Sequence, residues 1–179
     1  MQHRPGSTAG RTQPGTAAGD SLARAAAPGR KPRRVLLVAS GGGHWVQLLR
    51  MRAAWAHADA AYLTVQASYR LQVAGHRFYA VHDATRWSRL SLMLMVLQVA
   101  WVVLRERPDV IITTGAAPGL VALWVGKRLG AHTAWVDSIA NVEEMSLSGR
   151  RAGGFADLQL TQWAHLQAND RPAHRGAVL

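Results

Sequence analysis

The sequence predicts an α/β domain built on an open, mostly parallel β-sheet. The 179-residue chain is 49% hydrophobic and only 17% charged, which supplies enough apolar surface for a buried core and argues against global disorder. From residue 34 onward, short apolar runs alternate with segments of helical periodicity, and two of the strand–helix junctions are loops of glycine and other small residues. Such alternation is typical of parallel sheets whose strands are joined by crossover helices.

The first predicted element is a strand at residues 34–39, an unbroken apolar run. A strand that is apolar on both faces is typical of the centre of a parallel sheet. The glycine loop 40–43 ends this strand. Four apolar residues then recur at helical spacing: Trp45, Leu48, Leu49 and Trp55. This part of the chain therefore indicates a strand, a glycine loop and a helix in succession.

The rest of the domain continues the alternation. Further strands are predicted at residues 60–65, 78–81, 109–113, 133–136 and 158–161. A helix is predicted at residues 118–129, with Pro118 in its first turn and Gly130 directly after its end. Residues 171–179 are either a strand that docks a partner or a frayed tail.

Residues 90–104 form the most apolar segment. Its polar members are Ser91 and Gln98, and it carries no charge. As a helix it would be about 22 Å long, which is shorter than the roughly 30 Å hydrocarbon core of a bilayer. It is either a buried crossover helix or a helix lying in a membrane interface, and one helix can do both by facing the sheet on one side and lipid on the other. The expected lipid contacts are Trp87, Leu92, Met93, Met95, Val96 and Trp101.

The formal net charge is +11, from 21 Lys and Arg against 10 Asp and Glu. Residues 1–34 hold seven of the basic residues and one acidic residue, Asp20. This stretch cannot bury enough apolar surface to offset its ordering entropy, and it lacks the apolar core of a secretory signal. We predict a disordered basic arm at residues 1–33 and a folded domain at residues 34–179. The charge predicts an anionic partner: nucleic acid, a membrane or a phosphorylated substrate.

The chain has no cysteine. This excludes disulfides, a thiolate nucleophile and zinc or iron–sulfur sites with cysteine ligands. No metal site is expected.

Two loops of small residues are candidates for binding an anion. Residues 40–44, Ser-Gly-Gly-Gly-His, and residues 113–119 each follow a predicted strand and open a helix. Glycine lets backbone amides approach an anion, and two such loops at the carboxyl ends of parallel strands face one crevice. The first loop is neither a dinucleotide fingerprint, which needs a third glycine near Val46, nor a P-loop. The expected contacts to a phosphate or diphosphate are Ser40, Gly41, Gly42, Gly43, Gly115, Ala116, Ala117, Gly119 and Ser138.

Two titratable residues beside these loops are candidate catalytic residues. His44 is either a solvated residue or a group that donates to a phosphate or removes the proton of a sugar hydroxyl. Asp137 follows the strand predicted at residues 133–136 and is either a second catalytic group or an ordinary turn residue.

Three motifs together resemble one family. They are Val-Ala-Ser-Gly-Gly-Gly-His at residues 38–44, Pro-Asp-Val-Ile-Ile-Thr-Thr-Gly-Ala-Ala-Pro at residues 108–118, and Phe-Ala-Asp-Leu followed by Gln-Trp within residues 155–163. In their order and spacing, over most of residues 34–179, the chain resembles the PssD-like polysaccharide-biosynthesis proteins. These are relatives of the membrane-anchor subunit of the two-part UDP-GlcNAc transferase that makes dolichol-linked oligosaccharide.

The resemblance implies a Rossmann-like domain that corresponds to the N-terminal, acceptor-binding half of a GT-B glycosyltransferase. It places the acceptor loops at residues 41–44 and 115–119, and it puts Asp137–Ser138 where the family commonly has Glu-Ser. It further implies a glycosyltransferase subunit of exopolysaccharide or capsule biosynthesis that is active only with a partner. The chain alone is expected to bind no cofactor. The UDP-sugar donor is expected through a separate subunit, because 179 residues cannot hold two such domains and an arm.

The partners implied by the resemblance are this UDP-sugar-binding subunit, a polyprenyl-diphosphate-linked saccharide acceptor and an anionic membrane surface, with no specific nucleic acid. The expected location is the cytoplasmic face of the plasma (inner) membrane, as a peripheral or monotopic protein.

Two alternative functions stay open. A self-contained Rossmann-type nucleotide-sugar or nicotinamide enzyme is disfavoured, because the third glycine is missing and no acidic ribose ligand follows the second strand. A nucleic-acid-binding module that uses the basic arm is disfavoured, because the sequence has no recognisable RNA-binding or helix-turn-helix signature.

Overall fold

The computed structural model describes residues 31–84, 89–169 and 171–178. The compact unit considered below runs from Pro32 to Leu179. The basic arm predicted at residues 1–33 lies almost wholly outside the described residues, and so does Trp87, one of the expected lipid contacts.

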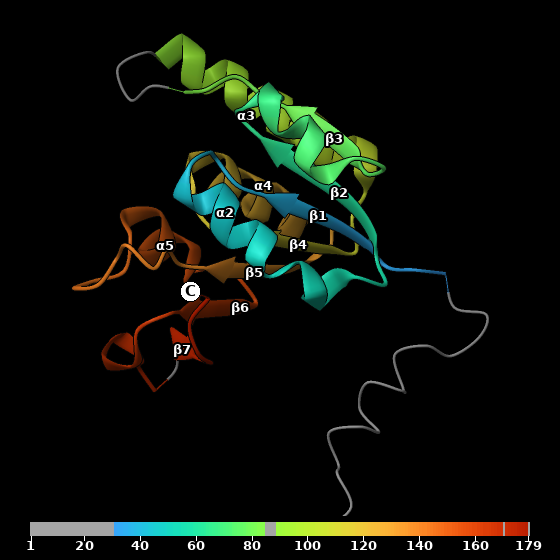
Figure 1. Cartoon of the computed structure of the whole chain (residues 1–179). Helices are drawn as coiled ribbons and strands as arrows, with labels where there is room; N and C mark the ends of the chain where they lie inside the picture. The colour runs from blue at the N-terminus through green and yellow to red at the C-terminus, as the bar shows by residue number, and fades with distance from the viewer. Residues whose placement is uncertain (1–30, 85–88, 170, 179) are drawn as a thin grey trace, which may run out of the picture. The chain divides into compact units, whose positions relative to one another are not determined.

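The unit is organised around a seven-stranded sheet in which every pairing is parallel. The strands lie in the order β3-β2-β1-β4-β5-β6-β7 (Figure 1). Their bounds are β1 Arg34–Val38, β2 Asp59–Thr64, β3 Arg77–Ala80, β4 Val110–Thr113, β5 His132–Val136, β6 Leu158–Thr161 and β7 Ala173–His174. β1 lies between β2 and β4. Strands β2 and β3 therefore extend the sheet on one side of β1, and β4 to β7 extend it on the other side. The predicted α/β fold class is confirmed, and such a switch point is where open parallel sheets bind ligands.

All six predicted strands are present, and their ends differ from the predicted ones by at most one residue. Of the two expectations for residues 171–179, the frayed tail is wrong, because β7 joins the sheet beside β6. Docking of a partner by this strand stays a prediction. A strand of two residues carries no apolar periodicity, so the sequence pattern gives no sign of its pairing.

Helices connect the strands and cover both faces of the sheet. Within the described residues they are α2 Gly43–Arg50, α3 Arg89–Glu106, α4 Ala116–Arg128 and α5 Leu147–Ala152, with 3-10 helices η1 Arg52–Trp55, η2 Ala67–Val73 and η3 Ala164–Leu166. The helices predicted at residues 90–104 and 118–129 correspond to α3 and α4. Trp55 does not belong to the first helix as predicted, because α2 ends at Arg50 and Trp55 lies in η1.

Alternate residues of the central strand face opposite sides of the sheet. Leu36 and Val38 pack in the cluster formed with α3 and α4, whereas Val35 and Leu37 pack with Trp45 of α2. In Figure 1, α2 lies in front of the sheet and α4 behind it. All four strand residues are buried, and full burial of such a side chain stabilises the fold by about 1.5–3 kcal/mol. Burial on both faces explains the unbroken apolar run in the sequence.

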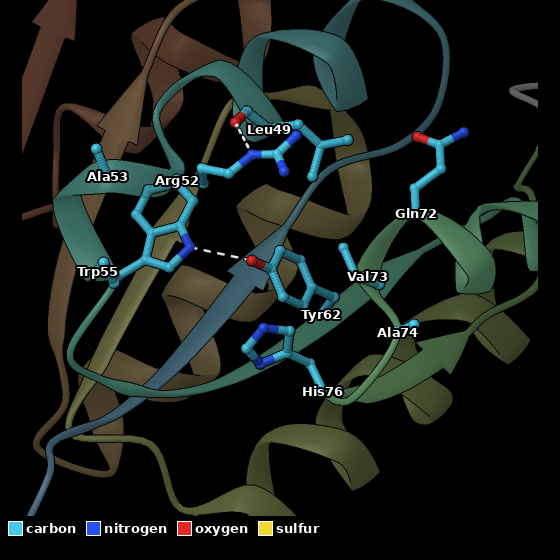
Figure 2. Close-up of a pocket in the computed structure, with 10 residues that line it drawn as sticks. Leu49, Arg52, Ala53, Trp55, Tyr62, Gln72, Val73, Ala74 and His76 are labelled. Carbon is cyan, nitrogen blue, oxygen red and sulfur yellow. Dashed lines mark hydrogen bonds between the residues drawn. The ribbon is translucent and has the colours of Figure 1, made fainter.

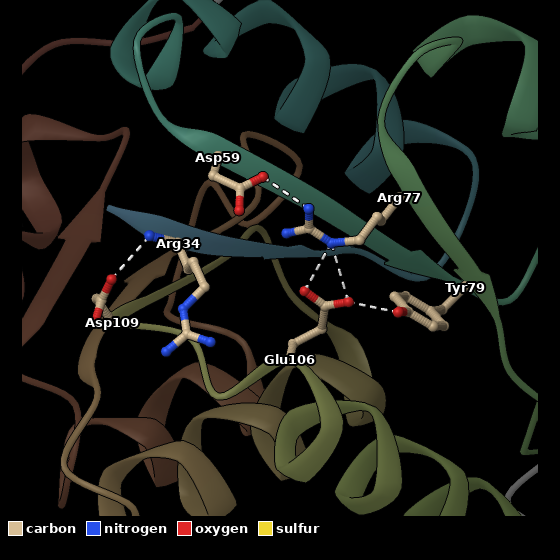
Figure 3. Close-up of polar contacts among 6 residues, drawn as sticks. All are labelled: Arg34, Asp59, Arg77, Tyr79, Glu106 and Asp109. Atoms are coloured by element: carbon tan, nitrogen blue, oxygen red, sulfur yellow. Dashed lines mark hydrogen bonds and ion pairs between the residues drawn. The ribbon is translucent and has the colours of Figure 1, made fainter. Parts of the chain in front are cut away.

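Charged side chains attach α3 to the amino-terminal edge of the sheet (Figure 3). Arg77, at the start of β3, donates to Asp59 Oδ1 at 2.7 Å and to Glu106 Oε2 at 2.9 Å. Tyr79 also donates to the Glu106 carboxylate, which lies buried in the last turn of α3. The hydrogen bond from Arg77 lowers the pKa of Asp59, whereas burial, and then the hydrogen bond to Glu106, raises the pKa of Tyr79. The carboxyl end of α3 is therefore fixed to β3.

Candidate functional site at the carboxyl ends of the central strands

The two predicted anion loops lie side by side at the switch point of the sheet. One loop connects β1 to α2 and the other connects β4 to α4, and β1 pairs with β4. The Thr114 amide of the second loop donates to the Val38 carbonyl at the end of β1, at 3.3 Å. The loops therefore share one crevice, as their positions in the sequence predict.

His44, in the first turn of α2, spans the two loops. Its Nδ1 lies 2.9 Å from the Thr114 carbonyl oxygen, and the Thr114 hydroxyl donates to the His44 carbonyl oxygen at 2.7 Å. Because a carbonyl oxygen can only accept, Nδ1 carries the proton, and the neutral ring then presents an unprotonated Nε2. Within the described residues, Nε2 makes no hydrogen bond. The geometry leaves this nitrogen able to accept a proton.

The second loop makes room for this imidazole. A Cβ on Gly115 would lie 2.8 Å from His44 Cε1 and 2.9 Å from His44 Nδ1, and the φ of Gly115 is +134°. A Cβ on Gly119 would lie 2.0 Å from Thr113 Oγ1, so this glycine brings α4 close to β4. Both glycines thus have packing roles that the sequence analysis did not foresee. Anion binding at these positions stays a prediction.

The first loop is held by contacts from β2 and η2. The Gly42 amide donates to the Tyr69 hydroxyl at 3.1 Å, and the Ser40 carbonyl accepts from the Val65 amide at 3.3 Å. Gly42 adopts a φ of +56°, which favours glycine. The Gly42 amide, predicted to bind an anion, therefore already has a protein partner, while Gly43 stays exposed at the start of α2.

Asp137 is buried, and its carboxylate accepts four hydrogen bonds. Oδ1 accepts from Trp135 Nε1 at 3.0 Å and from the Ser146 hydroxyl at 2.6 Å. Oδ2 accepts from Asn141 Nδ2 at 3.1 Å and from the Ser146 amide at 2.9 Å. These contacts hold the segment between β5 and α5 in place. They do not support the predicted catalytic role of Asp137. Neighbouring Ser138 is half-buried, and its hydroxyl accepts from the Ala140 amide at 3.3 Å.

Gln47 is a structural contributor that the sequence analysis missed. This buried residue of α2 donates from Nε2 to the Asp137 carbonyl oxygen at 3.0 Å and accepts at Oε1 from the Ile139 amide at 3.3 Å. Gln162, after β6, donates to the same Asp137 carbonyl at 3.0 Å. The one sign in the sequence is an amide side chain between two apolar residues, Val46 and Leu48, in a predicted helix.

A cavity of about 510 Å³ opens beside the two loops. Three of the predicted diphosphate contacts line it, namely Ser40, Ala116 and Ala117. Its remaining walls come from the segment after β3 and from α3, α4 and α5. The cavity therefore extends from the switch point toward the apolar helix.

The outer face of α3 is apolar and exposed. Leu92, Met93 and Trp101, all expected lipid contacts, have exposed fractions of 46%, 56% and 54%. Met95 corrects the prediction, because it is fully buried against the sheet, and Val96 is half-buried beside α4. None of the described helices is both long enough and apolar enough to cross a bilayer.

A second hollow, of about 290 Å³, lies beside the starts of β2 and β3 (Figure 2). Trp55 Nε1 donates to the Tyr62 hydroxyl at 3.1 Å, and the rings of Tyr62 and His76 meet edge to face at 5.5 Å between centroids. None of the predicted site residues lines this hollow. In the described part of the chain, no group of three or more His, Asp or Glu side chains is placed to hold a metal ion.

Solved structures of other proteins share this fold. MurG from Acinetobacter baumannii is 12% identical with a TM-score of 0.62, and the match covers 82% of this chain and 46% of that one. UDP-N-acetylglucosamine 2-epimerase from Rickettsia bellii is 14% identical with a TM-score of 0.61, covering 82% and 45%. A glycosyltransferase from Rickettsia africae is 10% identical with a TM-score of 0.52, covering 74% and 37%. The chain spans less than half the length of each, and the likeness establishes a Rossmann-like fold of the kind found in GT-B glycosyltransferases.

A family model described as "Oligosaccharide biosynthesis protein Alg14 like" matches residues 66–178. A comparison with curated protein sequences gave no match. The matched range includes the second loop and Asp137, whereas His44 and the first loop precede it. Because the match covers more than half of the 179 residues, the chain belongs to the Alg14-like family of oligosaccharide biosynthesis proteins.

Proposed function

We propose that this chain is the acceptor-binding, membrane-associating subunit of a two-component UDP-sugar glycosyltransferase that acts on a lipid-diphosphate-linked saccharide. The observation that carries the proposal is the position of His44 at the β1–β4 switch point. Its Nδ1 is held by the Thr114 carbonyl, and its Nε2 makes no hydrogen bond among the described residues. Family membership supports the substrate class.

Sugar transfer joins an acceptor hydroxyl oxygen to the anomeric carbon of the donor and breaks the bond from that carbon to UDP. The hydroxyl proton must go to a base, and Nε2 of His44 accepts it in our proposal. A positioned general base contributes about 10²–10⁴-fold to the rate. The negative charge that develops on UDP is stabilised mainly by the partner subunit.

The acceptor diphosphate lies beside Ser40, Ala116 and Ala117 in this proposal. These residues line the 510 Å³ cavity where α4 begins. The amino end of a helix favours a phosphate, because its unpaired amides point outward and its dipole is positive there. The same placement brings the acceptor saccharide toward His44, since β1 and β4 are adjacent.

The membrane contact is the exposed face of α3, together with the neighbouring surface of α4. Arg105 lies 5.3 Å from the ring centre of Trp101 on α3, and Arg128 lies 3.5 Å from that of Trp124 on α4. Exposed tryptophans beside arginines suit the boundary between hydrocarbon and anionic headgroups. With a net charge of +11, we place the chain on the cytoplasmic face of the inner membrane, as a peripheral or monotopic protein.

A separate subunit supplies the UDP-sugar-binding half in this proposal, so the chain alone binds no cofactor. Membership of the Alg14-like family supports this division. The narrower assignment, a PssD-like role in exopolysaccharide or capsule biosynthesis, rests on the three sequence motifs.

Reconstitution tests the proposal. The purified chain is incubated with a UDP-sugar and a polyprenyl-diphosphate-linked saccharide, with and without the candidate partner subunit, and the product is quantified. We expect product only with the partner, and a loss of about 10²–10⁴-fold on His44→Ala. His57→Ala, at an exposed position outside the crevice, serves as the control and keeps full activity. Transfer by the chain alone, or tight UDP-sugar binding without the partner, would contradict the proposal and favour a self-contained enzyme.

A further inference from the structure

Two cavities of this domain share a wall. The first, of 510 Å³, lies at the crevice, and the second, of about 290 Å³, lies between α3, α4 and α5. This second cavity is distinct from the hollow beside the starts of β2 and β3. Four residues line both of them: Val96, Leu120, Val121 and Arg151. The cavity at the carboxyl edge of the sheet therefore adjoins the groove between the helices.

The residues that line the two cavities differ in their chemistry. Ser40 and Ser148 line the first cavity, where α4 begins. The second cavity adds Trp124 and Phe155, and Arg151 is the one charged side chain among the described residues that line it. Asp83 also lines the first cavity, so an anion there is favoured on the side of Ser40, the amino end of α4 and Arg151, whereas the second cavity suits hydrocarbon.

Arg151 lies where the two cavities meet. Arg151 is exposed on α5, and its guanidinium makes no ion pair with the described residues, including Asp83, which also lines the first cavity. The preceding residue, Arg150, differs. It donates to Glu144 Oε2 and to the Met145 carbonyl oxygen, each at 2.8 Å.

We propose that this groove binds the polyprenyl chain of the acceptor next to its diphosphate, and that Arg151 contacts the diphosphate. The inference rests on the proposed function and adds to it a lipid subsite and a cationic contact. An unpaired cation beside an apolar groove complements a ligand whose anionic group is joined directly to hydrocarbon. The groove is also continuous with the exposed apolar surface, since Leu92 of the first cavity and Trp124 of the second are about half exposed.

Farnesyl diphosphate is a soluble probe that combines both chemical features. Its binding to the full chain is measured by titration calorimetry beside inorganic diphosphate and farnesol. We expect farnesyl diphosphate to bind more tightly than either. Arg151→Gln should weaken its binding roughly tenfold or more, because a charge-assisted contact is lost. Arg150→Gln is the matched control and should leave the affinity unchanged.

A second variant tests the apolar part of the groove. Val121→Phe fills the space that both cavities share, so it should weaken farnesyl diphosphate but not inorganic diphosphate. Equal affinity for these two probes, or no effect of Arg151→Gln on either, would overturn the proposal.

The transfer assay separates this inference from the proposed function. If transfer with the partner depends on His44 while Arg151→Gln leaves the KM for the lipid acceptor unchanged, the groove proposal fails and the function stands. If no transfer occurs with any partner, but farnesyl diphosphate binding depends on Arg151 and is blocked by Val121→Phe, the groove stands and the function fails.

Discussion

At the scale of single residues, His44 and Thr114 fix each other across 70 positions of sequence, because the side chain of each contacts the backbone carbonyl of the other. The contact of the imidazole with the Thr114 carbonyl is incompatible with a side chain at Gly115, because the imidazole occupies the space that a Cβ would need. The second loop therefore determines the orientation and the tautomer of a histidine that belongs to the first.

Gly115→Ala tests this arrangement. The new Cβ would meet His44 at 2.8 Å, and the backbone conformation is one that alanine rarely adopts. We therefore expect the unfolding free energy to fall by about 1–3 kcal/mol. We also expect sugar transfer with the partner subunit to be lost. Gly130→Ala is the matched control, because Gly130 also has a positive φ, +84°, and a Cβ added there would meet nothing within 4 Å. It should be destabilised by about 1–2 kcal/mol and keep its activity. Thermal unfolding and transfer rates are measured together, and normal activity of Gly115→Ala would contradict the assignment.

The sequence permits the loops and His44 to be predicted, but not their contacts. Glycines after an apolar strand are a local signal, whereas the match between His44 and Thr114 depends on which strands become neighbours. Asp137 illustrates the same limit. Its position after a strand predicts a place near the crevice. The groups that donate hydrogen bonds to its carboxylate come from Trp135, Asn141 and Ser146, and the sequence pattern does not reveal them.

At the scale of elements, α3 combines a firm attachment with an exposed apolar face. Glu106 holds its last turn to Arg77 and Tyr79 at the sheet edge, while Leu97 and Trp101 point to solvent with exposed fractions of 60% and 54%. A helix held in this way presents its apolar face in a fixed orientation. This is what a membrane-contacting element needs.

Leu97→Glu tests the membrane contact. A charge on this exposed face should weaken binding to phosphatidylglycerol vesicles by roughly tenfold or more, since burying a leucine side chain contributes about 1.5–3 kcal/mol. Folding should be unaffected, because the position is exposed. Leu71→Glu is the control, since Leu71 is 86% exposed on η2, away from α3. Co-sedimentation measures the bound fraction, and equal binding of both variants would contradict the assignment.

The apolar run 90–104 predicts a helix, but it does not show which side packs on the sheet. Its residues are apolar nearly all round, so periodicity cannot separate Met95, which is fully buried, from Met93, which is exposed. The packing of the helix against the sheet determines which of its residues are buried.

At the scale of the whole molecule, an ion pair and hydrogen bonds join consecutive elements on the β4–β7 side of the sheet. Asp157, just before β6, pairs with Lys127 at the end of α4 and accepts from the Thr133 amide of β5 at 2.9 Å. The hydrogen bond from Lys127 lowers the pKa of Asp157 to about 2. A lowered carboxyl pKa stabilises the folded state above the unfolded value and loses that stabilisation as pH falls toward the folded value.

The Asp157 contacts predict an acid-sensitive contribution to stability. Asp157→Asn should lower the melting temperature at pH 7, and the difference from the parent chain should shrink as pH falls from 3.8 to about 2. Because both side chains are more than one-third exposed, 1 M NaCl should reduce the difference as well. Glu143→Gln, at an exposed site, is the control and should have the melting temperature of the parent chain at each pH. A difference that stays constant from pH 7 to pH 2 would contradict this assignment.

The position of β1 at the centre of the sheet also has a consequence for the order of folding. Val35 pairs with Ala60 on one side and with Val110 on the other, so the central strand gains its second neighbour only after β4 has been synthesised. Closing so long a loop is entropically costly and slow. A nascent chain that ends before β4 lacks the Thr114 carbonyl that orients His44 and leaves one edge of β1 unpaired. The pairing of the central strand and the orientation of His44 therefore depend on the same stretch of chain, and no chain that ends before β4 can orient the histidine through Thr114.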